Sequence, residues 1–254
     1  MSRIQIETLG KSFDSRHVLQ NISLTLEPGR SLALIGPTAA GKTVLLKCLV
    51  GLYAPDEGTI RIDGADVTSP NMRAETLDDR IGMLFQQNAL FDSLSVWENI
   101  GFRLMARGST RAGARARAEE LLHQVGLPTE TADLFPADLS GGMQKRVGFA
   151  RAIATTPDIL LLDNPTAGLD PILAARIDAM ISSLARKNGA TVISATGNMV
   201  GLTQAYDDIA VLHDGVLRWH GDADRAEKDD NPWLRQLLSG SSAGPIETIN
   251  IEVQ

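Results

Sequence analysis

The chain has 254 residues, which is enough for one large domain or two small ones. Its net charge of −7 argues against a general nucleic-acid binder, which would present a basic face. The single cysteine, Cys48, excludes an intrachain disulfide, and no apolar run reaches the roughly 18 residues of a membrane span. The first ten residues hold no signal-peptide core, so we expect a cytoplasmic protein that reaches a membrane through a partner.

Strand patterns dominate the N-terminal part of the chain. Apolar and polar residues alternate in 4–9 and 18–29, which predicts two half-buried strands, while 31–37 is a nearly continuous apolar strand. Residues 42–52 carry apolar side chains at helical spacing, and 58–64 form a short strand between glycine turns.

The middle of the chain, from Asn88 to Arg146, consists mostly of predicted helices and loops. Residues 95–108 begin with a serine that is followed three positions later by a glutamate, the pattern of a capping box. Residues 110–127 form a second predicted helix. We interpret this region as a helical insert in a sheet domain.

Strands and helices then alternate. We predict strands at 158–163 and 190–196, a long helix at 171–189, a short helix at 199–206 and a hairpin at 208–221. Buried strands that alternate with helices imply a mainly parallel sheet that is covered on both faces.

The tail, 222–254, contains a short amphipathic helix at 231–238 and a flexible linker at 239–245. Residues 247–254 alternate again and predict a lone strand, which would need a sheet edge of its own or of another chain. Docking of this strand across a dimer is one hypothesis for the tail.

A phosphate-binding loop is predicted at "GPTAAGKT", which fits the pattern G-x-x-x-x-G-K-[ST] between a strand and a helix. The glycines let backbone N–H groups turn toward phosphate oxygens, and the helix N-terminus adds its dipole. Lys42 is expected between the β- and γ-phosphates, and the Thr43 hydroxyl on Mg²⁺. The alternative is a glycine turn with an exposed lysine. The predicted nucleotide ligands are Gly36, Pro37, Thr38, Ala39, Ala40, Gly41, Lys42 and Thr43.

Asp163 ends the predicted strand "DILLLD" and is expected to meet the same Mg²⁺ through water. A second anion site is predicted at "LSGGMQ", where Ser140, Gly141 and Gly142 offer a hydroxyl and bare amides at a helix start. A glycine turn with a capping serine is the alternative for this second motif.

These motifs and their order, over about residues 3–221, closely resemble the ATP-binding cassette (ABC) ATPases. The resemblance implies a P-loop NTPase (RecA-like) α/β core at 1–87 and 147–221, with an antiparallel β subdomain and a helical subdomain at 88–146. It also implies ATP and Mg²⁺ as cofactors, and two cassettes that face head to tail so that each "LSGGMQ" closes the partner's nucleotide site.

Three further site residues follow from the resemblance. Phe13 matches the aromatic residue that stacks on adenine, with a core phenylalanine as the alternative. Gln86 matches the glutamine that senses Mg²⁺ and the attacking water, and Asp170 matches the D-loop aspartate.

Several longer segments look like the Mla-type ATPases of phospholipid and organic-solvent-resistance transport, among them "IGMLFQQNALFDSLSVWENIGFRL" and "NPWLRQLLSG". That group implies a dimer of cassettes that drives an integral membrane permease from the inner face of the cell membrane. No nucleic acid is expected as a partner. The predicted lining of the permease groove is Leu90, Phe91, Leu94, Val96 and Trp97, with ordinary core packing as the alternative for each.

Two positions depart from the family pattern. Asn164 occupies the place of the catalytic glutamate, and an amide cannot accept a proton from water near neutral pH. Gly197 occupies the place of the switch histidine and supplies no side chain. Loss of a general base typically lowers the rate about 10²- to 10⁴-fold, so impaired hydrolysis is predicted, unless other groups compensate.

Three hypotheses remain open from the sequence. The chain is a slow but working transport ATPase, or an ATP-binding regulatory subunit that barely hydrolyses, or the degenerate half of a heterodimer. The arginines of "TRAGARAR", Arg111, Arg115 and Arg117, either meet anionic lipid headgroups or form a solvated helix face.

Overall fold

The computed structural model describes residues 2–68, 80–87 and 89–247. Its strands are β1 (Ile4–Phe13), β2 (Arg16–Leu26), β3 (Ser31–Ile35), β4 (Glu57–Ile62), β5 (Ala65–Asp66), β6 (Ile81–Leu84), β7 (Ile159–Asp163), β8 (Thr191–Ala195), β9 (Asp208–His213) and β10 (Val216–Asp222). The helices are α1 (Lys42–Val50), α3 (Val96–Ala106), α4 (Arg111–Gln124), α5 (Gly141–Ile153), α6 (Pro171–Asn188), α7 (Leu202–Ala205), α8 (Ala223–Ala226) and α9 (Pro232–Ser239). Two 3₁₀ turns, η1 (Thr129–Asp133) and η2 (Pro136–Asp138), precede α5.

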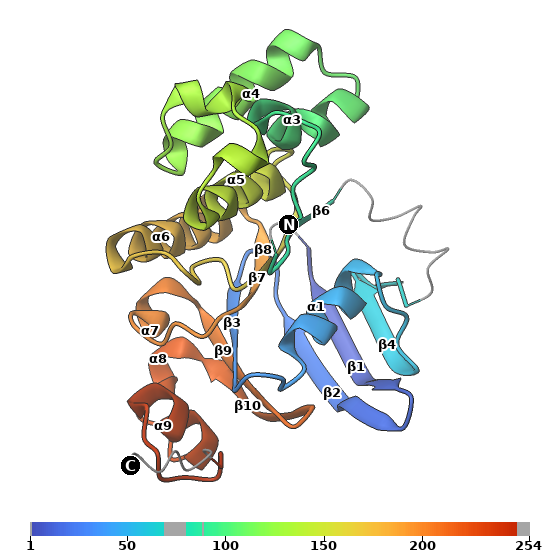
Figure 1. Ribbon diagram of the computed structural model, residues 1–254. Helices are drawn as coiled ribbons and strands as arrows, with labels where there is room; N and C mark the ends of the chain where they lie inside the picture. Colours follow the sequence, from blue (N-terminus) through green and yellow to red (C-terminus); the bar gives the residue numbers. More distant parts are fainter. Residues whose placement is uncertain (1, 69–79, 88, 248–254) are drawn as a thin grey trace.

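The described strands form two sheets (Figure 1). One is antiparallel with the order β2-β1-β4-β5. The other has the order β10-β9-β3-β8-β7-β6 and is parallel except for the hairpin of β9 and β10. Because β3, β8 and β7 are neighbours, their carboxyl ends lie side by side at one edge of the sheet.

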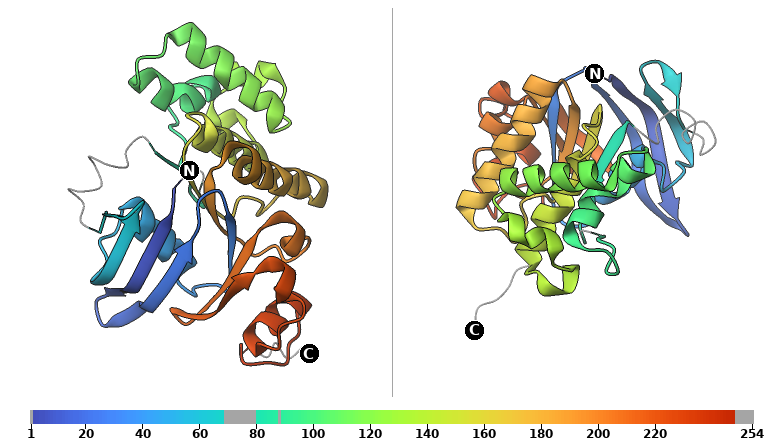
Figure 2. Two further views of the ribbon diagram at one scale, coloured as in Figure 1. Left: turned by 180° about the vertical axis from the view of Figure 1, so that it is seen from behind. Right: turned by 90° about the horizontal axis from the view of Figure 1, so that it is seen from above.

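The parallel sheet separates two hydrophobic cores because successive side chains of a strand point to opposite faces. Leu32 and Leu34 of β3 face α1 and the antiparallel sheet, whereas Ala33 and Ile35 face the helices on the other side. The right-hand view of Figure 2, seen from above, shows helices on one side of the parallel sheet and the antiparallel sheet on the other. Cys48 is buried in the first core, as its place on an apolar helix predicts.

The helical insert gathers α3, α4 and α5 at one end of the molecule (Figure 1). α3 begins at the predicted capping box, in which the Ser95 backbone and hydroxyl donate to the Glu98 carboxylate. α5 runs continuously through residue 146, so the predicted division between insert and core falls inside a helix that both parts share.

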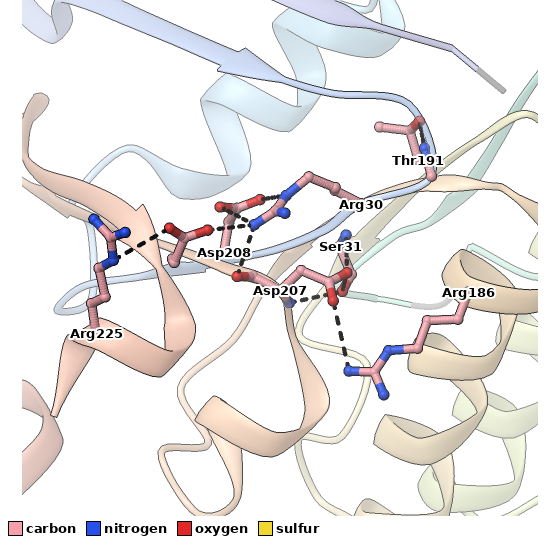
Figure 3. Close-up of polar contacts among 9 residues, drawn as sticks. Arg30, Ser31, Arg186, Thr191, Asp207, Asp208 and Arg225 are labelled. Atoms are coloured by element: carbon pink, nitrogen blue, oxygen red, sulfur yellow. Dashed lines mark hydrogen bonds and ion pairs between the residues drawn. The ribbon is translucent and has the colours of Figure 1, made fainter.

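A polar cluster ties the opposite, amino-terminal ends of the parallel strands together (Figure 3). Arg30 donates to Asp208 at 2.6 and 2.8 Å and to Asp222 at 2.8 Å, and these contacts raise its pKa further above the usual range. The Asp207 carboxylate accepts from the backbone and hydroxyl of Ser31 at 2.9 and 2.8 Å. The cluster anchors β9 against β3.

The predicted α/β architecture, with its antiparallel subdomain and helical insert, is confirmed. The helix at Pro232–Ser239 is also found where the sequence predicts it. The predicted strand at 248–253 lies outside the described residues. Within the described ranges, no helix combines the length and the apolar character that a membrane crossing requires.

Candidate functional site

The loop between β3 and α1 holds a backbone that only glycine accepts at two positions. Gly36 has φ 151°, and a Cβ there would lie 2.0 Å from the Leu212 carbonyl oxygen. Gly41 has φ 105°, and its Cβ would lie 2.9 Å from the Val18 carbonyl oxygen. The loop is therefore packed closely against β9 and β2 at these two glycines.

Lys42 and Asp163 approach this loop from two elements. The Lys42 ammonium donates to the carbonyl oxygens of Gly36 and Pro37 at 2.7 and 2.8 Å. Burial lowers its pKa, and the charge of Asp163 opposes that shift. Asp163 ends β7 and is 1% exposed; burial raises its pKa, and the Thr43 hydroxyl and nearby lysines oppose the shift.

The predicted Mg²⁺ ligands fit that ion. One carboxylate oxygen of Asp163, Oδ1, is buried and has no hydrogen-bond partner among the described residues. The hydroxyl of Thr43 hydrogen-bonds the Asp163 carboxylate, and the Gln86 side chain lines the same pocket as Thr43. The described residues hold no cluster of three His, Cys, Asp or Glu side chains. A hard cation held by one carboxylate, with phosphates supplying other ligands, is how proteins usually bind Mg²⁺.

The phosphate loop lines a pocket of about 410 Å³. Its described walls bring together the phosphate loop, Gln86 and both positions that depart from the family pattern, Asn164 and Gly197. Arg16 and Val18 of β2 complete it. The loop residues in its walls are Gly36, Thr38, Ala39, Ala40, Gly41, Lys42 and Thr43.

Phe13 lies beside this pocket rather than in its wall. It ends β1, is 38% exposed, and meets Tyr53 edge to face at 5.1 Å between ring centroids. The Lys11 ammonium lies 5.3 Å from its ring centroid. Phe13 is therefore a surface residue, and the alternative of a core phenylalanine is wrong.

The second predicted anion site lies away from the pocket of its own chain. Ser140 caps α5 by accepting from the Met143 amide at 3.3 Å, and a Cβ at Gly141 would meet nothing within 4 Å. A Cβ at Gly142 would lie 3.3 Å from Leu169. Asp170 caps α6, accepting from the amides of Ile172 and Leu173 at 3.0 Å each.

The two positions that depart from the family pattern differ in backbone conformation. Asn164 has φ 53°, in the left-handed region that asparagine tolerates better than most residues. Its backbone N–H donates to the carbonyl oxygen of Ala195 at 2.8 Å, and its backbone carbonyl oxygen accepts from the Lys145 ammonium at 3.0 Å. Gly197 has no positive φ, and a Cβ there would meet nothing within 4 Å. Nothing in the described backbone requires glycine at 197.

Lys145 contacts the site at Asn164, although the sequence pattern gives it no role there. It lies on α5 and is only 7% exposed, and burial lowers its pKa while Asp163 opposes that shift. Its spacing of four residues from the buried Phe149 places both on the inward face of α5, and that spacing could have revealed it. A second residue that no motif indicates, Asp178, lines another pocket that borders Asn164 and Gly197.

A groove of about 430 Å³ lies between the helical insert and the core. Phe91, one of the residues expected to meet a permease, lines it together with Phe102, Arg103 and Arg151. Val96 and Trp97 do not line it, because they are buried on the inner face of α3 at 0% and 5% exposure. The other two predicted lining residues, Leu90 and Leu94, are half-buried outside its walls.

The three arginines of α4 pair with acidic side chains. Arg111 contacts Glu98 at 2.7 Å, Arg115 contacts Glu119 and Asp133 at 2.8 and 2.7 Å, and Arg117 contacts Glu120 at 2.6 Å. These pairs are those of a solvated, salt-bridged helix face.

Comparison with known proteins extends this geometry. The sequence profile of the ABC transporter family matches residues 19–167. The sulfate/thiosulfate import ATP-binding protein CysA of Synechococcus elongatus is 38% identical over 246 residues, which cover 97% of this chain and 69% of that protein. Protein TRIGALACTOSYLDIACYLGLYCEROL 3, chloroplastic, of Arabidopsis thaliana is 35% identical over 260 residues, with 96% and 75% covered.

A solved structure agrees with these matches. The dimeric, post-hydrolysis ATP-binding cassette MJ0796 with ADP and Pi has a TM-score of 0.82 and 29% identity, covering 87% of this chain and 98% of that one. Fold and loop together define a P-loop NTPase. The family match covers more than half of the sequence. The chain therefore belongs to the ABC transporter family, as an ATP-binding subunit of such a transporter.

Proposed function

We propose that the chain binds MgATP in the pocket of the phosphate loop. The backbone amides from Gly36 to Thr43 surround the phosphates, and Lys42 lies between the β- and γ-phosphates. Thr43, Asp163 and Gln86 hold Mg²⁺, which neutralises phosphate charge when bound. The observation that carries this proposal is the buried, unpartnered Asp163 oxygen beside a glycine loop that admits no side chain at Gly36.

Two further groups of residues contact the nucleotide in this proposal. Phe13 stacks on the adenine, and its edge-to-face contact with Tyr53 fixes the orientation of its ring. Ser140, Gly141 and Gly142 of a second cassette, with Asp170 nearby, cover the phosphates. The open space around Gly141 supports this part, because nothing within the described part of the chain itself explains a missing side chain there.

The hydrolysis rate is expected to be low. Asn164 can hold the attacking water by a hydrogen bond but cannot take its proton near neutral pH, and Gly197 offers no group to the γ-phosphate. ATP binding and closure are preserved, and the chemical step is slowed.

The cargo proposed for the transporter is phospholipid or a related lipid, moved by a permease at the cytoplasmic face of the cell membrane. The resemblance of residues 81–104 to Mla-type ATPases supports it. The permease helix would enter the groove of Phe91 and Phe102. The name of one relative gives import of sulfate and thiosulfate, which are chemically unlike a lipid. The cargo therefore needs its own test.

A second candidate is the degenerate half of a heterodimer. The "LSGGMQ" motif keeps Ser140, Gly141 and Gly142, whereas positions 164 and 197 depart from the family pattern. This contrast favours the second candidate. In that arrangement this chain completes the competent site of a different cassette. Purified chain that closes with MgATP only after a second, complete cassette is added would support this candidate over a homodimer.

Substitution of Gly141 by Asp tests the nucleotide clamp. The Cβ has room, so the variant should fold and bind MgATP as a single chain with unchanged affinity. Its carboxylate would repel phosphates held by the opposing cassette, so MgATP-dependent dimers should disappear on sizing. Dimers of native strength in this variant would contradict the head-to-tail clamp.

The cargo is tested by reconstitution with the permease that co-purifies with this chain. Vesicles that contain both proteins and a fluorescent phospholipid should lose label to an acceptor lipid-binding protein only when MgATP is present. A complex with Lys42→Ala should not move the lipid. ATP turnover that responds to sulfate and not to lipid would reject the lipid assignment.

A further inference from the structure

A second pocket borders the nucleotide pocket at both positions that depart from the family pattern. It has a volume of about 470 Å³ and lies between α6, the loop after β7 and the loop after β8. Asn164 and Gly197 line both pockets. Since a Cβ at Gly197 would meet nothing within 4 Å, the missing side chain leaves open space where the two pockets adjoin.

One carboxylate lines this second pocket. Asp178 projects from the third turn of α6 and is half-buried. The Asn198 side-chain amide donates to its Oδ2 and the Tyr206 hydroxyl to its Oδ1, both at 3.4 Å. These long contacts hold the carboxylate in place while leaving its remaining lone pairs to the pocket.

The surroundings of Asp178 favour its protonated form. Burial raises its pKa, and the hydrogen bonds from Tyr206 and Asn198 oppose that shift. Tyr206, directly after α7, is the titratable group that faces it among the described residues, and burial raises the pKa of that phenol as well. When it is ionised, a carboxylate with a raised pKa is a stronger base than an ordinary one.

The pocket is also suited to hold water between Asp178 and the nucleotide pocket. Thr166, Thr196 and Asn198 contribute polar side chains to its walls. Its volume exceeds the roughly 30 Å³ share of one liquid water many times, and a buried water needs two to four such polar partners.

We propose that Asp178 is the proton acceptor for ATP hydrolysis in this chain, acting through water across the gap at Gly197 in place of the missing glutamate. The proposal rests on the proposed binding of MgATP. The oxygen of the attacking water forms a bond to the γ-phosphorus, and the bond from that phosphorus to the β,γ-bridging oxygen breaks, releasing ADP. The proton of the attacking water passes along the pocket water to Asp178 and later returns to solvent.

Because Asp178 acts through water, it is a positioning and proton-accepting residue that does not touch the substrate. A merely structural role, tying α6 to the loop of Asn198, is the competing account. The two accounts differ in how Asp178 behaves once a glutamate is restored at 164.

The test compares Asp178→Asn in two backgrounds, the native chain and the double variant Asn164→Glu with Gly197→His. Asparagine keeps the shape and can still pair with Tyr206 and Asn198. In the native chain kcat should fall at least tenfold, with KM for MgATP changed less than about twofold, since a general base typically contributes about 10²–10⁴. In the double variant the same substitution should change kcat less than about twofold.

Two further variants sharpen the result. Gly197→Leu fills the gap and should lower the native kcat as Asp178→Asn does, with no additional loss when both are combined. Tyr206→Phe removes a hydrogen bond that lowers the pKa of Asp178, so the acid limb of the pH–kcat profile should move to higher pH. Glu119→Gln, on the solvent face of α4, is the matched control and should leave kcat and the profile unchanged.

An equal loss in both backgrounds would show a structural role and overturn the inference. A native chain that binds MgATP but shows no measurable turnover would also overturn it, while leaving the proposed nucleotide site intact. A chain that does not bind MgATP would instead reject the proposed function, and binding is therefore measured first by calorimetry.

Discussion

The nucleotide pocket has two halves that depend on the backbone to different degrees. In the binding half, side chains are excluded at Gly36 and Gly41, where a Cβ would lie 2.0 and 2.9 Å from a backbone carbonyl oxygen. In the hydrolytic half, a Cβ at Gly197 meets nothing, and Asn164 occupies a left-handed conformation that asparagine tolerates. The binding half is thus part of the fold, and the hydrolytic half consists of replaceable side chains.

This difference predicts that the two halves respond differently to substitution. A change at Gly36 would disturb the contact of the loop with β9, whereas a side chain added at 197 would enter open space. Changes in the binding half should therefore have the largest effects, and changes outside both halves the smallest.

Gly36→Ala should break the binding half. The new Cβ must displace the Leu212 backbone, and alanine resists a φ of 151°. We expect the unfolding free energy to fall by about 2–4 kcal/mol and MgATP binding to weaken more than about 10²-fold. Thermal denaturation and calorimetry measure both, with Gly197→Ala as a control that should unfold at the native temperature. Native stability in Gly36→Ala would contradict the close packing described for this loop.

Lys42→Ala should weaken binding without unfolding the chain. The ammonium contributes charge-assisted hydrogen bonds to phosphate, so the Kd for MgATP should rise about 10- to 10²-fold. Lys187→Ala, an exposed lysine at the end of α6, should leave Kd unchanged. Equal effects of the two substitutions would show that general positive charge, and not the loop, binds the nucleotide.

Asp178→Asn should stabilise the fold at neutral pH. Burial raises the folded-state pKa of this carboxyl, so the folded state favours the neutral form. The stabilisation that the neutral Asp178 carboxyl gives the folded state is fully present below its pKa in the unfolded chain, about 3.9. It is lost as pH rises through the pKa in the folded state. The variant should therefore melt higher than the native chain at about pH 7.5 and alike at about pH 4. A lower melting temperature at the higher pH would mean that the ionised carboxylate is favourably paired.

Arg117→Ala should have the smallest effect, because it lies outside both halves. Its pair with Glu120 is solvated, so the unfolding free energy should change by at most about 0.5 kcal/mol. Binding to anionic phospholipid vesicles, followed by co-sedimentation, should not change. A clear loss of vesicle binding would revive the hypothesis that these arginines meet lipid headgroups.

The parts that sequence predicts well are those with a local cause. The glycine pattern at 36–43 encodes its own loop, and strand–helix alternation encodes the parallel sheet that brings Asp163 to it. Asp178 escapes prediction because only the packing of α6 brings it near Asn198, twenty residues away. The prediction of Trp97 in the groove is wrong, because a residue in the first turn of an amphipathic helix can equally face the core.

The central claim is that this subunit has kept nucleotide binding and lost most of its hydrolytic chemistry through two side chains. The most direct measurement compares the native chain with Asn164→Glu plus Gly197→His, recording Kd for MgATP and steady-state kcat on the same samples. We predict a Kd within about threefold and a kcat higher by about 10²-fold or more. An unchanged kcat, or a native chain that already turns over as fast as the double variant, would contradict the claim.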